Sequence, residues 1–295
     1  MLEPHRVLEQ VKSRRRALPP VRLGLRTALG LWKTARRVPL VNRARVTVRA
    51  NGHRMRVRLF SYDDLLTISD DYEPCLRGVP IEPGAIVVDA GAFIGRHALE
   101  FARAVGPAGR VVAVEPVASN FALLRHNVAI NGYPSVTCVR CALGASDGET
   151  TLSYGRETSI ASAAGGGDRS ERVPLRRLDG VLDELGIRRI DFLKVDVEGA
   201  ELDLVRGAER VLAASPECRL AIEAHGRKTD KLQSMLHEWL STRGYLIKEA
   251  DEAGRRFLFA AKRPGIEAFF IRGAEAPTEP RGSSPRRTGA ILTLA

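Results

Sequence analysis

The stretch Ile86–Leu99, with the sequence IVVDAGAFIGRHAL, constrains the fold more than any other part of the chain. Its apolar start leads into an acid and a Gly-x-x-x-Gly loop, and such an unbroken apolar run suits a parallel strand buried on both faces. Gly91 and Gly95 allow the backbone to approach a ligand closely, and the helix that follows offers unpaired N–H groups at its N-terminus. The pattern predicts a strand–loop–helix unit that binds a nucleotide-like cofactor.

A second apolar strand follows at Arg110–Glu115 and ends in a carboxylate, 24 residues after Gly91. An acid in this place can accept hydrogen bonds from both hydroxyls of a ribose. The glycine loop alone is a weak signal, because an ordinary strand–helix–strand unit also uses glycines for close packing. Together with Asp89 and the strand-ending Glu115, the loop favours cofactor binding over packing alone.

Length and composition set broad limits. The 295 residues, 44% of them hydrophobic, suit one large α/β domain with additions or two small domains. Residues 1–60 hold 16 Lys and Arg against two acids, whereas the remainder holds 30 basic and 33 acidic residues. The excess of basic charge therefore belongs to the N-terminal part, and we expect no nucleic-acid partner. No apolar run reaches the length of a membrane span or a secretory signal, so we expect a cytoplasmic protein with reduced cysteines.

Residues 1–45 predict a basic helical extension. Over residues 21–37, apolar side chains that include Trp32 share one helical face, and arginines and lysines gather on another. Such a helix could bring residues 1–40 into peripheral contact with an anionic membrane, at its inner face. Docking of the helix on its own domain, with the charged face in solvent, is the favoured alternative.

Residues 46–80 predict a hairpin and a lead-in to the core. Asn51-Gly52 separates two runs in which apolar and polar residues alternate, which is a strong hairpin signal. One face of this hairpin is rich in arginine and could attract an anionic substrate, although a solvated face is the commoner explanation. The acidic segment 61–76 predicts a helix that closes over the cofactor loop.

From residue 83 onward, strands and helices alternate. We expect strands near 86–90, 110–115, 135–141, 190–195 and 219–223, and helices near 95–105, 118–131, 177–185, 200–213 and 230–243. This alternation predicts a parallel, doubly wound sheet. Two closely spaced strands, 245–249 and 256–261, predict an antiparallel edge pair, because no crossover helix fits between them. The Gly-rich stretch within 142–175 predicts a disordered insertion or a lid, and residues 273–295 a disordered tail.

Four segments resemble a known family: VVDAGAFIGRHAL, AVEPVASNFALLRHNVAING, CALGASDGE and FLKVDVEGAELDLVRGAE. They are similar to the FkbM-type family of S-adenosylmethionine-dependent methyltransferases, and the Lys-x-Asp-x-Glu-Gly-Ala-Glu motif is the most specific part. The resemblance implies an α/β class I methyltransferase (Rossmann-like) fold, with a seven-stranded doubly wound sheet and an antiparallel edge pair. The resemblance covers roughly residues 60–262, and we place the S-adenosylmethionine-dependent methyltransferase domain at residues 81–272. It also implies O-methylation of a hydroxyl on a sugar, glycan or natural product.

The resemblance also implies a binding site for S-adenosyl-L-methionine. Gly91 and the neighbouring amides would hold the methionine end, Asp89 would support this loop, and Glu115 would hold the ribose. Two residues after the third strand would flank the adenine through backbone and apolar contacts. The predicted cofactor-binding residues are Asp89, Gly91, Gly95, Glu115, Ala142 and Leu143.

The catalytic candidates follow the fourth and fifth predicted strands, and ligands in such sheets bind beyond the carboxyl ends of strands. They are Asp196, Glu198, Glu223 and His225. His225 is the candidate base, because the pKa of an imidazole lies near working pH, and Glu223 or Glu198 could orient it. Asp196 would bind the acceptor hydroxyl or the cofactor amine. We expect no metal, with Mg²⁺ held by the same carboxylates and His225 as the alternative.

Three other classes compete with this hypothesis. A nucleic-acid methyltransferase that acts on amino groups would resemble a pattern with Pro-Pro and an aromatic residue at the end of the fourth strand, and Asp196–Gly199 lacks it. A nicotinamide-dependent oxidoreductase would carry Gly-x-Gly-x-x-Gly, which this chain lacks. A non-catalytic module that binds anionic surfaces would not need Asp89, Glu115 and Asp196. The acceptor is expected to be a small molecule or a carbohydrate. Its identity and the oligomeric state stay open, because the segments 60–80 and 144–175 match no known specificity pattern.

Overall fold

The computed structural model describes residues 44–59, 61–68, 76, 79–155, 167–225, 229–252 and 255–262. The chain divides into two compact units, residues 1–45 with 58–60 and residues 46–57 with 61–295. The first unit lies almost wholly outside the described residues, as do the predicted basic extension and the predicted tail. None of the described helices has the length and apolar character needed to cross a membrane.

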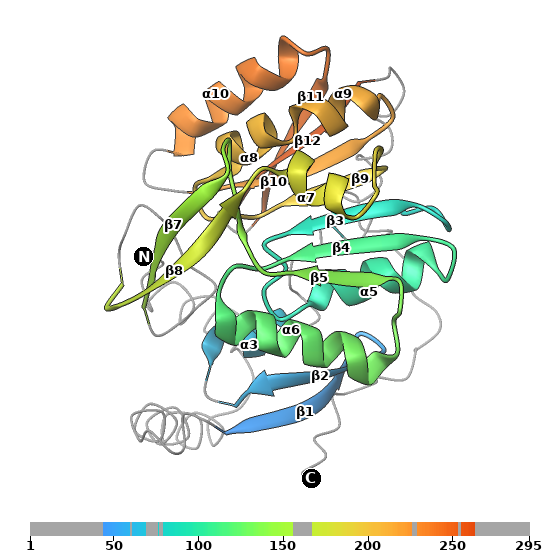
Figure 1. Ribbon diagram of the computed structural model, residues 1–295, viewed down its shortest axis with the longest axis vertical. Coiled ribbons are helices and arrows are strands. Elements are labelled where there is room, and N and C mark those ends of the chain that lie inside the picture. Colours follow the sequence, from blue (N-terminus) through green and yellow to red (C-terminus); the bar gives the residue numbers. More distant parts are fainter. Residues whose placement is uncertain are drawn as a thin grey trace, which may run out of the picture. The chain divides into compact units, whose positions relative to one another are not determined.

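A seven-stranded sheet organises the second unit, in the order β11-β12-β10-β9-β3-β4-β5 (Figure 1). Its strands are β3 (Ile86–Ala90), β4 (Arg110–Val114), β5 (Val136–Val139), β9 (Phe192–Val195), β10 (Arg219–Ala224), β11 (Leu246–Glu252) and β12 (Arg255–Ala261). The strands from β10 to β5 are parallel, whereas β12 pairs antiparallel with both β10 and β11. The predicted class I methyltransferase fold with its antiparallel edge pair is therefore confirmed.

Helices alternate with these strands as predicted. They are α5 (Arg96–Val105), α6 (Ala118–Asn131), α7 (Leu178–Glu184), α8 (Glu201–Gly207), α9 (Glu209–Ala214) and α10 (Thr229–Ser241). The single helix expected over 200–213 is wrong, because the chain breaks at Ala208 into α8 and α9. Gly207 precedes this break and packs so closely on Gly144 that a Cβ would lie 2.0 Å from the Gly144 carbonyl oxygen.

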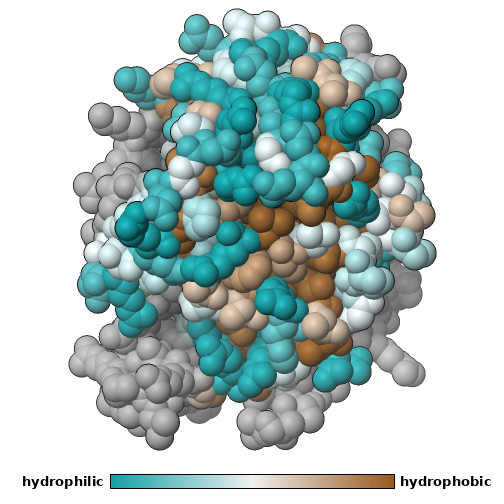
Figure 2. All heavy atoms as spheres, in the orientation of Figure 1, coloured by the Kyte–Doolittle hydropathy of each residue, from teal (hydrophilic) through white to brown (hydrophobic). Residues whose placement is uncertain are grey.

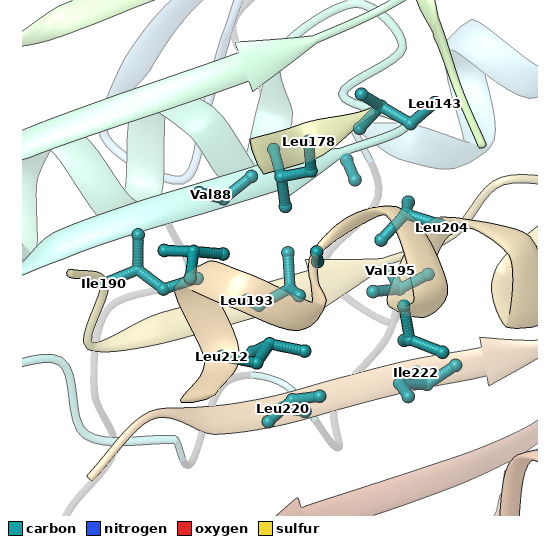
Figure 3. Packing of buried hydrophobic residues seen from close by; sticks show 14 of the residues in the cluster. Val88, Leu143, Leu178, Ile190, Leu193, Val195, Leu204, Leu212, Leu220 and Ile222 are labelled. Atoms are coloured by element: carbon teal, nitrogen blue, oxygen red, sulfur yellow. The ribbon is translucent and has the colours of Figure 1, made fainter. Parts of the chain in front are cut away.

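Both faces of the sheet are covered, which explains why its strands are apolar throughout. Val88, Leu193 and Leu220 point to the face that α7, α8, α9 and α10 cover, where they join the main core (Figure 3). Alternation along β9 sends Phe192 to the opposite face. There its ring lies edge-on to Phe101 of α5, with the centroids 5.5 Å apart.

The Asn51-Gly52 hairpin is present as predicted, with β1 (Arg45–Ala50) paired to β2 (His53–Arg58). Both turn residues have positive φ, 52° and 80°, as a type I′ turn requires. The helix α3 (Tyr62–Thr67) follows, and the Ser61 side chain caps it by accepting from the Asp64 amide. The hairpin and a helix at the start of the acidic segment are therefore confirmed, whereas residues 69–75 of that segment lie outside the described residues.

The segments on either side of the Gly-rich stretch form strands that were not predicted from the sequence. β6 (Ala142–Leu143), β7 (Gly148–Tyr154) and β8 (Arg169–Arg176) form a separate three-stranded sheet, in the order β6-β8-β7. Leu152 and Val173 stabilise it by packing against Val117 and Ala142 in a small core of their own. The Gly-rich centre, residues 156–166, lies outside the described residues.

The surface seen in Figure 2 is largely hydrophilic, with hydrophobic residues gathered toward the middle of the described part. Among the described residues, four large apolar side chains are exposed: Tyr62 and Leu66 of α3, Met235 of α10 and Leu246 of β11. Scattered apolar residues of this kind are normal on protein surfaces. We assign them no function.

Candidate active site

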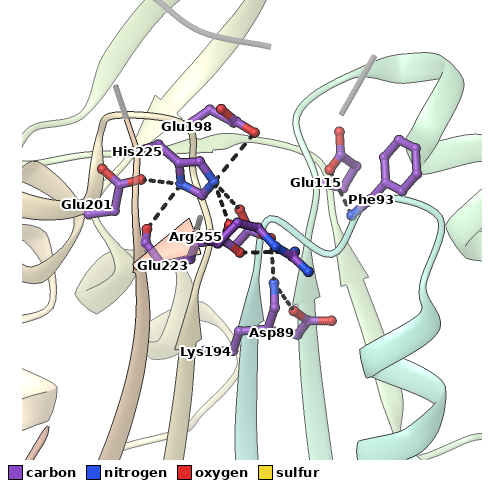
Figure 4. Close-up of polar contacts among 10 residues, drawn as sticks. Asp89, Phe93, Glu115, Lys194, Glu198, Glu201, Glu223, His225 and Arg255 are labelled. Carbon is purple, nitrogen blue, oxygen red and sulfur yellow. Dashed lines mark hydrogen bonds and ion pairs between the residues drawn. The ribbon is translucent and has the colours of Figure 1, made fainter. Parts of the chain in front are cut away.

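The candidate site lies where β9 and β10 end, beside β3 (Figure 4). Adjacent parallel strands end at the same edge of a sheet, so residues far apart in the sequence meet there. Asp196 directly follows β9, and His225 directly follows β10. Asp89 of β3 stands opposite Lys194 of β9 in the register of the two strands.

His225 lies at the centre of a cluster of carboxylates. Its Nε2 is 3.1 Å from Glu223 Oε1, 3.6 Å from Asp196 Oδ1 and 3.8 Å from Glu198 Oε1. Its Nδ1 is 3.1 Å from Glu201 Oε1. The structure thus brings all four predicted catalytic residues together and adds Glu201, which was not assigned a role.

The turn between β9 and α8 aims Glu198 at this imidazole. Glu198 has φ of 53° and Gly199 has φ of 102°, and a left-handed conformation is uncommon for a residue with a side chain. Glu201 Oε1 stabilises the turn by accepting the Gly199 amide at 3.0 Å. One oxygen of Glu201 therefore fixes both the turn and the imidazole of His225.

Two cations that the sequence reasoning missed also belong to the site. The buried Lys194 places Nζ 3.1 Å from Asp196 Oδ2 and 3.5 Å from Asp89 Oδ1. Arg255, at the start of β12, lies 3.7 Å from Glu223 Oε2. Lys194 stands in the Lys-x-Asp-x-Glu-Gly-Ala-Glu motif and could have been found there, whereas no local signal marks Arg255.

This environment changes the protonation of the cluster. Burial opposes charge on His225, but its hydrogen bonds with Glu201 and Glu223 and the nearby carboxylates raise its pKa well above 6.5. Burial raises the pKa of Glu198 to about 8, despite the attraction of His225. Burial also opposes ionisation of Asp196, yet the charges of Lys194 and His225 hold its pKa below the usual value.

The expectation that His225 titrates near working pH is therefore wrong for the cluster as it stands. The raised pKa favours the doubly protonated imidazole, in which neither ring nitrogen has a lone pair to accept another proton. The pKa of His225 could not be predicted, because the sequence does not show that the tertiary structure surrounds this ring with four carboxylates.

Glu115, the predicted ribose ligand, connects the glycine loop to the start of α6 through hydrogen bonds. It is buried, and its Oε2 accepts the Phe93 amide of the glycine loop at 3.0 Å. Its Oε1 accepts the Val117 amide at 2.9 Å and the Asn120 side-chain amide at 3.2 Å. Glu115 is thereby fixed between the loop and α6, at the carboxyl end of β4.

The glycine loop itself packs tightly. A Cβ on Gly91 would lie 1.8 Å from the Asp196 carbonyl oxygen, and one on Gly95 would lie 2.8 Å from Leu124 Cδ1. The amides of Gly91 and Ala92 both donate to the Val114 carbonyl. These amides therefore hold the loop in place instead of pointing at a ligand, and Gly91 allows the loop to touch the Asp196 turn.

The two residues predicted to flank adenine form the short strand β6. Both side chains are buried, Leu143 in the main core and Ala142 in the small core beneath β7 and β8. β6 pairs with β8, in which Leu175 stands opposite Ala142. Their contact with a cofactor stays a prediction.

The chain matches known methyltransferases. The family model described as "Methyltransferase FkbM domain" matches residues 89–256. Methyltransferase sdnD of Sordaria araneosa is 32% identical over 185 residues, which cover 51% of this chain and 68% of that protein. The 31-O-demethyl-FK506 methyltransferase FkbM of Streptomyces tacrolimicus is 29% identical over 165 residues, which cover 45% of this chain and 63% of that protein.

A solved structure adds a more distant likeness. The crystal structure of methyltransferase FkbM from Methylobacillus flagellatus KT has 24% sequence identity and a TM-score of 0.44, over 59% of this chain and 43% of that one. The matched part of this chain thus spans less than two thirds of the Streptomyces and Methylobacillus proteins.

Proposed function

Because the chain belongs to the FkbM methyltransferase family, we propose that it transfers a methyl group from S-adenosylmethionine to a hydroxyl oxygen of a sugar, glycan or natural product. The observation that supports the site is the cluster around His225, which follows two adjacent strands at the edge where such sheets bind ligands. The name of the Streptomyces relative, 31-O-demethyl-FK506 methyltransferase, refers to an oxygen of FK506, which favours oxygen as the acceptor atom.

The proposed reaction needs alignment and the loss of one proton. The acceptor oxygen attacks the methyl carbon in line with the carbon–sulfur bond, which breaks and leaves its electron pair on sulfur. The hydroxyl proton must leave for the alcohol to become a good nucleophile. Since the raised pKa of His225 disfavours its role as the base, we assign proton acceptance to the surrounding carboxylates and keep Asp196 as the residue that binds the acceptor hydroxyl or the cofactor amine.

Glu115 is the cofactor residue whose setting supports its proposed role best. Three donors from the loop and α6 hold its carboxylate in one position, and each carboxylate oxygen can accept more than one hydrogen bond. A ribose placed beyond β4 would add its two hydroxyls to this carboxylate. Asp89, Gly91 and Gly95 would act by shaping the loop.

We expect Glu115→Ala to weaken S-adenosylmethionine binding by roughly 10- to 100-fold, because it removes hydrogen bonds to a charged acceptor that are worth about 1.5–3 kcal/mol. Isothermal calorimetry of both proteins checks this. Glu149→Ala, in the exposed part of β7, is the control and should leave the affinity unchanged. Because Glu115 also holds the loop, urea unfolding of each variant must show that the domain stays folded. Unchanged affinity in Glu115→Ala, or tight binding of NADH by the wild type, contradicts the assignment.

The reaction class is tested separately. The full chain is incubated with S-adenosylmethionine that carries a ¹³C-methyl group and with a panel of glycosides and polyketides. NMR then locates the transferred carbon. A methyl group on a hydroxyl oxygen is expected, whereas a product methylated only on nitrogen or carbon excludes the proposal.

A further inference from the structure

We propose that Asp196, Glu198 and His225 form a binding site for a divalent transition-metal cation, for which Mn²⁺ is the probe. Each residue offers one ligand atom, and these atoms lie within 4.8 Å of one another. The three come from the ends of two neighbouring strands and from the turn that precedes α8, so the fold itself assembles them. This proposal replaces the expectation of a metal-free site.

The distances from His225 Nε2 to the oxygens of Asp196 and Glu198 are short enough for a metal ion to lie between these atoms. Two ligands that each lie about 2.1 Å from a metal can be at most about 4.2 Å apart. His225 Nε2 is 3.6 Å from Asp196 Oδ1 and 3.8 Å from Glu198 Oε1, and both separations are within this limit. An ion between these atoms would need only small side-chain movements to reach all three.

Neighbouring residues hold the ligands in the orientation that metal binding needs. Glu201, which is fully buried, lies 3.1 Å from His225 Nδ1, so that nitrogen carries the hydrogen and Nε2 faces the carboxylates (Figure 4). Metal-bound histidines usually have such a carboxylate partner on the other ring nitrogen. Lys194 holds Asp196 Oδ2, and this contact turns Oδ1 toward the imidazole.

The negative charge of the carboxylates in this site also favours a bound cation. The five carboxylates are those of Asp89, Asp196, Glu198, Glu201 and Glu223. Lys194 and Arg255 lie among them as cations, and His225 is neutral when it acts as a ligand, because its Nε2 proton must leave before a metal can bind. Carboxylates gathered in a partly buried place repel one another, so a dication between them would stabilise this arrangement.

The chemistry of the three ligand atoms indicates which metal the site prefers. Mg²⁺ prefers oxygen ligands only, whereas an imidazole nitrogen favours first-row transition metals and carboxylates suit Mn²⁺. Two carboxylate oxygens with one imidazole nitrogen therefore point to Mn²⁺ before Mg²⁺. Three protein ligands leave coordination positions for an acceptor oxygen and water.

The catalytic consequence rests on the proposed function. A hydroxyl bound to the cation loses its proton more easily, as metal-bound water does. The O–H bond breaks and the proton passes through a carboxylate of the cluster to solvent. The oxygen then forms the O–CH₃ bond while the S–CH₃ bond breaks and its electron pair stays on sulfur. With its Nε2 on the metal, His225 is a ligand and not a base.

The experiment measures Mn²⁺ binding to the full chain after chelator treatment and desalting. Titration followed by the electron paramagnetic resonance signal of free Mn²⁺ should show one site per chain. Asp196→Asn, Glu198→Gln and His225→Ala should each weaken binding by about tenfold or more. Asp203→Asn is the matched control, because this exposed acid of α8 pairs with Arg206 outside the cluster and should leave binding unchanged.

Two further measurements identify the ligand and the positioning residue. Spin-echo modulation from a ¹⁴N nucleus should accompany bound Mn²⁺ in the wild type and vanish in His225→Ala. Glu201→Gln should weaken Mn²⁺ binding by roughly 10- to 100-fold while the nitrogen signal persists. Absence of Mn²⁺ binding to the wild type, or equal binding by the wild type and a folded His225→Ala variant, overturns the proposal.

The proposed metal site and the proposed reaction can each be refuted without refuting the other. Methyl transfer that continues undiminished in excess EDTA, together with a lack of Mn²⁺ binding, overturns the metal site and keeps the methyltransferase. Mn²⁺ binding at the three residues, without any S-adenosylmethionine binding, supports the metal site and overturns the proposed function.

Discussion

At the scale of the residue, Glu198 shows how position sets chemistry. Its left-handed backbone places a carboxyl among three other acids, and burial followed by their repulsion raises its pKa to about 8 from the ordinary 4.5. The folded protein thus favours the protonated form of this side chain. The stability that this preference contributes is fully present below about pH 4.5 and is lost as the pH rises through about 8.

We therefore predict that Glu198→Gln flattens the pH dependence of stability. The amide keeps the shape of the protonated carboxyl and cannot ionise, so the variant should lose less unfolding free energy than the wild type between about pH 5 and pH 8. Urea unfolding in the presence of EDTA measures this without metal. Glu149→Gln is the control, since its carboxylate is exposed. An identical pH profile for the wild type and Glu198→Gln would show that Glu198 ionises normally.

At the scale of the element, two asparagines of α6 hold the hairpin strand β2. Asn127 Oδ1 accepts the Arg56 amide at 2.7 Å, and its Nδ2 donates to the Arg56 carbonyl at 3.2 Å. Asn131 repeats this pattern with Arg54, at 2.9 and 2.6 Å. Each side-chain amide therefore pairs with the strand much as a neighbouring backbone would. Asn127 Nδ2 also donates to the Ile94 carbonyl at 2.8 Å, which ties the glycine loop to the same helix.

We predict that Asn127→Ala destabilises the protein by about 2–4 kcal/mol, because it removes the partners of the buried Ile94 carbonyl and of part-buried backbone groups of β2. Asn131→Ala, on the exposed part of the same helix, should cost only about 0.5–1.5 kcal/mol. Urea unfolding gives both values, and Arg125→Ala on the exposed face of α6 serves as the control. Equal effects of the two asparagine substitutions would contradict the role of burial.

At the scale of the whole molecule, charge is divided unevenly along the chain. Residues 1–60 carry a net charge of +14, whereas the remaining residues carry −3. A basic, amphipathic segment with Trp32 on its apolar face suits either docking on its own domain or contact with anionic lipid. The two hypotheses differ in how the full chain behaves with vesicles.

The favoured hypothesis, docking, predicts that the full chain stays in the supernatant when vesicles of phosphatidylglycerol and phosphatidylcholine are sedimented. Membrane contact predicts sedimentation that decreases as salt screens the attraction. In that case replacing Arg22, Arg26, Lys33 and Arg37 by Gln should abolish it. The control replaces four exposed cations of the catalytic domain: Arg125, Arg172, Arg188 and Arg189. Sedimentation that only the first replacement abolishes would refute docking as the sole role of the segment.

The sequence by itself determined the central sheet and the neighbourhood of the site. Apolar runs, glycines and turn residues are local signals, so the strand Ile86–Ala90, the Asn51-Gly52 hairpin and the antiparallel edge pair could all be read directly. The place of Asp196 and His225 followed as well, because the carboxyl ends of adjacent parallel strands must share one edge.

Only the tertiary structure decided what these residues can do. The pKa of His225 depends on four carboxylates that come from two strand ends, a turn and a helix start, and no local pattern shows that they converge on one ring. Arg255 joins them solely because β12 lies beside β10. The pairing of β7 with β8 was hidden for a similar reason, since it is stabilised by packing against Val117 and Ala142 and not by strongly apolar strands of its own. Periodicity specifies elements, whereas charge, protonation and ligand geometry depend on distances that exist only after the chain has folded.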